Sequence, residues 1–168
     1  QKYYSFGVSG VPRDLHASLV NALTDMGARA IVFDILFAEP APADALFSES
    51  IEKSGNVFLP VAFYIPEKQA SSQLIASDHE VLADVIAPLK PGTAGMGHIN
   101  AEIDTDGKAR RIPLFIQRNG ILVPQIALLA ATKVMGISID QVRVFEDHLV
   151  LSDTLKIPVI DSNSLLVN

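Results

Sequence analysis

The sequence predicts an α/β fold, a single domain in which a mixed sheet is flanked by helices and a β-rich part follows toward the C-terminus. Segments with helical periodicity alternate with nearly continuous apolar segments in the first half of the chain, and short β-branched segments dominate the last third. The chain has 168 residues, of which 49% are hydrophobic, enough for one domain with a large core. We therefore expect residues 1–168 to form one domain.

The first helix is expected over residues 15–26, where apolar side chains recur at helical spacing. Pro12 lies near its start and Gly27 just past its end. The segment 30–37 is almost continuously apolar and rich in β-branched and aromatic residues. It predicts a strand buried on both faces, as in a parallel sheet covered by helices.

A second helix and a second strand follow. The helix is expected over residues 43–54, before Gly55, and the strand over residues 57–65. Pro60 lacks a backbone N–H, so it indicates an edge, a bulge or a break in this strand. Residues 66–76 are polar and predict an exposed loop.

A third helix is expected over residues 81–89, because Ser77 and Glu80 have the spacing of a capping box and apolar residues follow. A hairpin is expected next, with His98, Asn100, Glu102 and Asp104 on one polar face. That face is either a ligand-binding surface or a solvated side of the sheet. The remaining elements are expected as a helix over residues 123–135 and strands over residues 142–145, 148–151, 155–157 and 165–167.

The composition excludes several classes of function. A net charge of −6 argues against nucleic acid and anionic lipid as partners, because both attract basic patches. The chain has no cysteine, which excludes disulfides, thiolate metal sites and cysteine nucleophiles. No run of about 18 uninterrupted apolar residues is present, so any membrane-spanning segment is expected outside this piece of the protein.

Asp34 is a carboxylate in the middle of an apolar strand. An unpaired buried charge is costly, so Asp34 is expected to be paired, to lie near the end of the strand or to be protonated. It is either a structural residue or part of a ligand site, since α/β sheets bind ligands beyond the carboxyl ends of their strands. Glu39 would then belong to the same edge. Arg110 shares strand parity with apolar residues, and we expect it to pair with Asp34 or Asp104.

The segment Asp104-Thr105-Asp106-Gly107 permits three interpretations. A calcium loop would need a glutamate where Pro113 stands, and a DxDG phosphatase motif would follow a buried strand. A hairpin turn is favoured, with Asp accepting backbone hydrogen bonds and Gly adopting positive φ. His98, Glu102 and Asp104 have spacing that could face one metal, but solvated side chains are favoured. No cofactor, metal or catalytic residue is expected.

The chain resembles the type-two CHASE domain, an extracytoplasmic sensor module. The resemblance rests on the helix after Pro12-Arg13, on GARAIVFDILFAEP and SGNVFLPVAFY, and on GHINAEIDTDGKARRIPL with its DG-x-x-R core at Asp106, Gly107 and Arg110. It extends into the tail IPVIDSNSLLVN, whereas YYSFGVSG matches the family's first strand poorly. The resemblance implies a sensor outside the inner membrane, joined through flanking transmembrane helices to a histidine kinase, nucleotide cyclase or diguanylate cyclase.

Three hypotheses follow. The leading one is a non-enzymatic sensor that binds an unidentified small-molecule or protein signal and forms a homodimer in the full-length receptor. The second is a structural dimerisation module, for which residues 121–131 are a candidate surface. The third is a DxDG-type phosphatase. The candidate ligand-binding residues are Asp34, Glu39, Asn100, Asp104 and Arg110.

Overall fold

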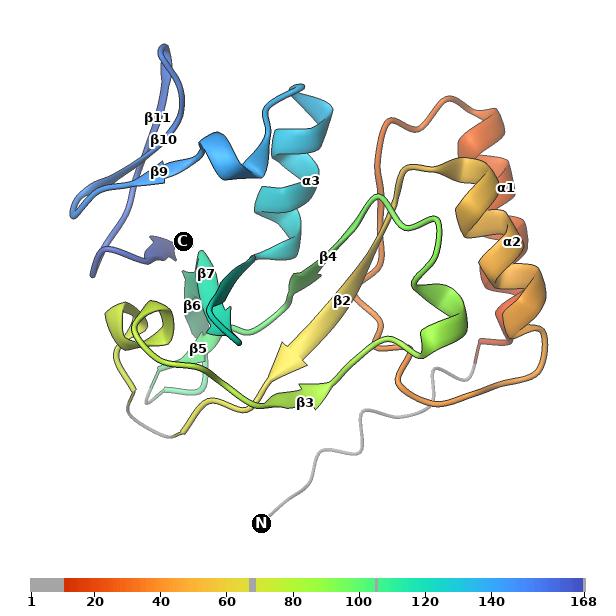
Figure 1. Ribbon diagram of the computed structural model, residues 1–168, viewed down its shortest axis with the longest axis horizontal. Helices are drawn as coiled ribbons and strands as arrows, with labels where there is room; N and C mark the ends of the chain where they lie inside the picture. Colours follow the sequence, from red (N-terminus) through yellow and green to blue (C-terminus); the bar gives the residue numbers. More distant parts are fainter. Residues whose placement is uncertain (1–10, 67–68, 105, 168) are drawn as a thin grey trace. The chain divides into compact units, whose positions relative to one another are not determined.

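The computed structural model describes residues 11–66, 69–104 and 106–167 (Figure 1). Its helices and sheets confirm the mixed α/β fold. The chain divides into two compact units, each described by itself below: unit 1 comprises residues 1–61 and 83–96, and unit 2 comprises residues 62–82 and 97–168. That residues 1–168 act as one domain stays a prediction. Residues 3–10, the poor match to the first strand of the CHASE-type family, lie outside the described part.

Unit 1 contains the first two predicted helices, α1 (Arg13–Asp25) and α2 (Asp44–Ser54), which lie side by side (Figure 1). Both predictions are confirmed. Gly55 ends α2 with φ of 64°, a left-handed conformation that costs glycine little. The helices pack on a core whose large members are Phe33, Phe37, Phe47, Ile51, Leu59 and Leu89.

The predicted strand at residues 30–37 is much shorter than expected. β1 (Ile31–Val32) pairs in parallel with β2 (Val57–Phe63), and Phe33 N–H still donates to the Phe58 carbonyl at 3.1 Å. In this register the next N–H of β2 directed at β1 would belong to residue 60, and Pro60 has none. The pairing with β1 ends there. β2 itself continues through Pro60 and pairs with β1, β3 and β4, so the edge or break expected at Pro60 is wrong. Val32 is 44% exposed, so the expectation of burial on both faces is wrong.

The four-stranded sheet has the order β1-β2-β3, and β4 (Gly95–His98) also pairs with β2. β3 (Val81–Ala83) and a single 3₁₀ turn, η2 (Ala87–Leu89), occupy the segment predicted as a helix. That prediction is wrong because the backbone of this region forms hydrogen bonds with other segments of the chain. Tyr64 N–H donates to the Glu80 carbonyl, and Ile86 N–H donates to the Phe37 carbonyl, both at 2.9 Å. These bonds place the segment in extended conformation.

Unit 2 contains most of the short strands. β5 (Glu102–Ile103), β6 (Ala109–Pro113) and β12 (Ser164–Leu166) form one antiparallel sheet in the order β12-β6-β5. β7 (Phe115–Arg118) and β8 (Ile121–Pro124) form a hairpin, followed by α3 (Ile126–Val134). β9 (Arg143–Val144), β10 (His148–Ser152) and β11 (Leu155–Pro158) form a third antiparallel sheet. The predicted helix and the four C-terminal strands are confirmed.

The core of unit 2 forms where α3 and the C-terminal strands meet, around Leu114, Phe115, Leu128 and Leu149. Two further 3₁₀ turns were not predicted, η1 (Ser71–Ile75) and η3 (Ile139–Gln141). η1 lies in the segment predicted as an exposed loop, yet Ser71 and Leu74 are buried. No helix among the described residues is both long and apolar enough to cross a bilayer.

Candidate functional site

The predicted ligand residues of unit 1 lie on the surface. Asp34 is exposed, because the chain leaves the sheet after Val32. The prediction of a carboxylate inside a strand is wrong, and Asp34 lies just past the end of β1, which was one of the alternatives expected for it. Glu39 is also exposed, and its backbone carbonyl accepts a hydrogen bond from Arg13 at 3.1 Å. Arg13 is buried, pairs with Asp44 at 2.8 Å and lies 4.6 Å from the ring centre of Phe37. The Glu39 backbone therefore helps to hold the start of α1.

Arg110 forms an ion cluster with the two aspartates of the hairpin turn. Its guanidinium lies 3.0 Å from Asp104 Oδ2 and 2.7 Å from Asp106 Oδ2. The predicted pairing with Asp104 is confirmed; the side chain is 38% exposed, so its expected direction toward the apolar side is wrong. Hydrogen bonds from Arg110 hold the pKa of Asp106 below its usual value, and the two carboxylates raise the pKa of Arg110.

The predicted hairpin turn is confirmed around this cluster, apart from Thr105, which lies outside the described residues. Gly107 has φ of 80°, and its N–H donates to the Asp104 carbonyl at 2.9 Å. Lys108 N–H donates to Asp106 Oδ1 at 3.2 Å. The acidic groups of the turn are thus bonded to the chain's own guanidinium and amides. The geometry fits a turn stabilised by local contacts.

The other polar residues of the hairpin contact distant parts of unit 2. Asn100 binds both backbone groups of Phe63: its Oδ1 accepts from the N–H at 2.9 Å and its Nδ2 donates to the carbonyl at 2.8 Å. Ser71 Oγ donates to Glu102. The amide of Asn100 therefore takes the place of a neighbouring strand at the end of β2.

His98 is fully buried. Its ring nitrogens have no partner with full hydrogen-bond geometry, although the backbone of Leu114 interacts with the ring. Burial lowers the pKa of His98 to about 3, so the ring is neutral near pH 7. It is therefore a core residue, in contrast to the polar position expected for it. In the part of the chain that the structure describes, no three His, Cys, Asp or Glu side chains are grouped to hold a metal ion.

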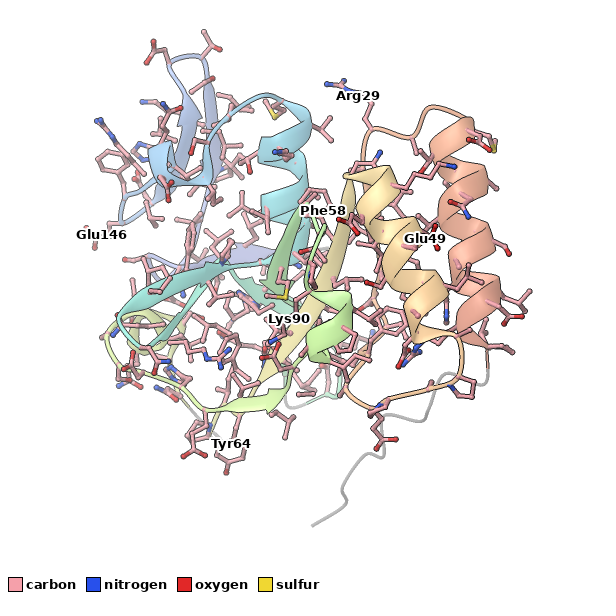
Figure 2. All side chains as sticks on the ribbon, turned by 45° about the vertical axis from the view of Figure 1, so that its right-hand side comes forward. Arg29, Glu49, Phe58, Tyr64, Lys90 and Glu146 are labelled. Atoms are coloured by element: carbon pink, nitrogen blue, oxygen red, sulfur yellow. The ribbon has the colours of Figure 1, made fainter. Side chains whose placement is uncertain are left out.

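A hollow of about 240 Å³ opens in unit 2 between the end of β2 and the start of β3. Its walls include Tyr64, Gln69, Asp78, His79 and Glu80. Tyr64 is 59% exposed and projects away from the ribbon (Figure 2), whereas His79 is 9% exposed. We refer to this site as the Tyr64 hollow. Sequence reasoning missed it, because it treated residues 66–76 as a loop and Glu80 as a helix cap.

A second hollow of about 420 Å³ lies near the C-terminal sheet, between residues 136 and 153. Arg143 and Asp153 contribute charge, and Ile137 and Val150 contribute apolar surface. Its polar side chains are on short strands and turns with high exposure. None of its described lining residues has a buried polar side-chain atom without a hydrogen-bond partner, in contrast to the Tyr64 hollow.

Comparison with known proteins gives one match. A family model described as the CHASE2 domain matches residues 3–168, essentially the whole chain. The chain belongs to the CHASE2 domain family. CHASE2 domains are extracellular sensory domains of receptors and are not themselves catalytic. No curated protein and no solved structure matches this CHASE2 domain.

The DG-x-x-R segment of this CHASE2 domain has a structural role. Asp106 and Arg110 form an ion pair across the turn, and Gly107 supplies the positive φ that the turn requires. All three residues of the segment thus serve the hairpin. Among the described ion pairs of this CHASE2 domain, none involves a residue that lines the Tyr64 hollow.

Proposed function

We propose that this CHASE2 domain is the periplasmic signal-input domain of an inner-membrane receptor, such as a sensor histidine kinase or a nucleotide cyclase. The match to the CHASE2 family over residues 3–168 carries this proposal. Transmembrane helices on either side would connect the domain to the output module, and the receptor would act as a homodimer. We expect the domain to catalyse no reaction, because a sensor acts by changing the relative populations of two receptor states.

The predicted ligand residues of each unit, taken separately, remain part of this proposal, with a restriction from the observed contacts. Asp104 and Arg110 are bonded to each other, and Asn100 is bonded to Phe63. A ligand at these residues would have to replace internal hydrogen bonds. Asp34 and Glu39 are exposed and would need no such replacement.

The absence of cysteine from the chain permits a direct test of topology. Glu49 lies on the exposed side of α2 and Glu146 lies in unit 2 (Figure 2). Glu49→Cys or Glu146→Cys is introduced into the full-length receptor, from which any other cysteine has been removed. A membrane-impermeant maleimide is then added to cells with a permeabilised outer membrane. We expect labelling without lysis; labelling only after lysis would contradict a periplasmic domain.

A structural dimerisation module is a second candidate, favoured by exposed apolar side chains on and just before α1. Val11, Leu15 and Leu19 recur at four-residue spacing and are 46%, 55% and 48% exposed, and Met26 is 81% exposed. The segment 121–131 is a weaker candidate, since Ile126 and Leu128 are buried. α3 is thus largely a core helix.

Sedimentation of the wild-type chain and of two variants tests this candidate. Leu15→Glu with Leu19→Glu places charge on the α1 stripe and should convert a dimer into a monomer. Leu122→Glu, at an exposed position of β8 that is also apolar, should leave the dimer intact. A wild-type chain that stays monomeric at high concentration would count against dimerisation through this domain alone.

A further inference from the structure

The walls of the Tyr64 hollow are fixed by hydrogen bonds within unit 2. Tyr64 N–H donates to the Glu80 carbonyl and His79 N–H donates to the Gln117 carbonyl, both at 2.9 Å. Asp78 Oδ1 accepts from Gly120 N–H at 3.0 Å. Residues 78–80, which carry three of the lining side chains, are therefore held by hydrogen bonds to residue 64 and to residues 117 and 120. The backbone of a binding site on such a segment has a defined shape.

Two polar atoms at this hollow are buried without a partner, Gln69 Oε1 and His79 Nδ1. Most buried polar atoms in native proteins have a hydrogen-bond partner, and leaving one unpaired lowers stability. The Gln69 oxygen can only accept a hydrogen bond, and a neutral imidazole accepts one at its unprotonated nitrogen. A ligand that donates N–H groups can therefore pair with the Gln69 oxygen, and with His79 Nδ1 in the tautomer that leaves this nitrogen unprotonated.

The charge around the hollow favours a cation. Asp78 and Glu80 line the hollow and are exposed, so they supply negative charge there. The exposed ring of Tyr64 adds a surface that attracts cations through its π electrons. A metal ion is disfavoured, because no three metal-binding side chains are grouped among the described residues.

The size of the hollow restricts the ligand further. Its volume of about 240 Å³ lies below the range of about 300–1,000 Å³ that is usual for sites of drug-sized ligands. An organic cation with a few carbon atoms is the expected occupant.

We propose that the Tyr64 hollow binds a small organic cation that carries N–H donors, such as an alkylammonium or guanidinium group. This ligand would be the signal of the sensor, so its biological meaning rests on the proposed function. Gln69 Oε1 and His79 Nδ1 are closed to solvent, so the ligand reaches them only when these side chains turn. The ligand therefore binds the rearranged state more tightly, which is the difference in affinity that a sensor needs.

The test is an NMR titration of the ¹⁵N-labelled chain of residues 1–168 with n-butylammonium. We expect saturable shifts of the amides of residues 64, 79 and 80, with a Kd on the order of 1 mM, since a ligand of so few atoms makes few contacts. n-Butanol, which has no charge, and tetramethylammonium, which has no N–H, should bind at least about tenfold more weakly. Equal binding of all three compounds would overturn the proposal.

Variants of the lining residues make the test specific. Glu80→Gln and Gln69→Met should each weaken n-butylammonium binding about tenfold, through loss of a charge and of an acceptor respectively. If Glu80→Gln does not fold, Asp78→Asn replaces it as the variant that removes a negative charge, because its amide oxygen can still accept from Gly120 N–H. Glu146→Gln changes the same charge at an exposed position outside the lining of the hollow and should leave Kd unchanged.

The outcomes separate this proposal from the proposed function. Absence of saturable binding, or an equal loss in Glu146→Gln and Glu80→Gln, would overturn the ligand site while the cysteine-labelling result stands. Specific binding in a protein that labels only after lysis would support the site and contradict the periplasmic receptor.

Discussion

Asn163 is fully buried in unit 2, and its side chain makes three hydrogen bonds to backbone groups. Its Oδ1 accepts from Phe115 N–H at 3.0 Å, and its Nδ2 donates to the carbonyls of Phe115 and Ser71 at 2.8 and 2.9 Å. Asn163→Ala removes the partner of all three groups. Each costs about 1–3 kcal/mol when left buried and unpaired, so the free energy of unfolding should fall by at least about 3 kcal/mol.

Urea and thermal unfolding of the purified chain measure this effect. A loss of about 3 kcal/mol corresponds to a fall in Tm of about 6–12 °C for a chain of this size. Asn163→Leu fills most of the space and should lose a similar amount, because its cost also comes from unpaired backbone groups. Asn21→Ala is the matched control, since Asn21 is half-buried and makes one bond, to Ser50 at 3.3 Å. A loss below about 1 kcal/mol in both Asn163 variants would refute the reasoning.

Three further predictions concern other parts of the chain. Gly97→Ala should lower the free energy of unfolding by about 1–3 kcal/mol in urea, because its new Cβ would lie 2.6 Å from the Cα of Ile126; an unchanged midpoint would contradict this close packing. Arg110→Gln should raise the pKa of Asp106 toward its usual value, as measured by carboxyl ¹³C titration; an unchanged pKa would exclude Arg110 as its cause. Burial lowers the pKa of His98 from 6.5 to about 3, so the unfolded chain binds the extra proton between these values. Stability should therefore fall as the pH decreases from 6.5 toward 3, and His98→Gln should reduce this slope in urea titrations at several pH values. An identical pH dependence in both proteins would show that His98 does not contribute.

The sequence predicts best those elements whose signals are local. The periodicity before Gly27 and before Gly55 gives α1 and α2 within two residues of their observed ends. The short C-terminal strands are also recovered, because turn residues separate β-branched segments there. The hairpin turn follows from Asp106 and Gly107, whose chemistry needs no distant partner.

Predictions that depend on distant partners are less successful. The segment 81–89 has a helical apolar pattern, but pairing with Tyr64 and Phe37 keeps much of it extended. Asn100 and Glu102 bond to residues that lie 37 and 31 positions away, and no local pattern identifies such partners. The exposed position of Asp34 likewise depends on where β1 ends, which Pro60 of another strand determines.

The two units of the chain are interleaved. Each consists of two separate stretches, because residues 62–82 of unit 2 precede residues 83–96 of unit 1. No single truncation can yield either unit as a continuous fragment. During synthesis, unit 1 lacks its last stretch until part of unit 2 has been made, and Asn163 of unit 2 must find Ser71 across 92 positions. Contacts between residues so far apart in the sequence form slowly, so we expect unit 2 to complete its folding only after Asn163 has been synthesised.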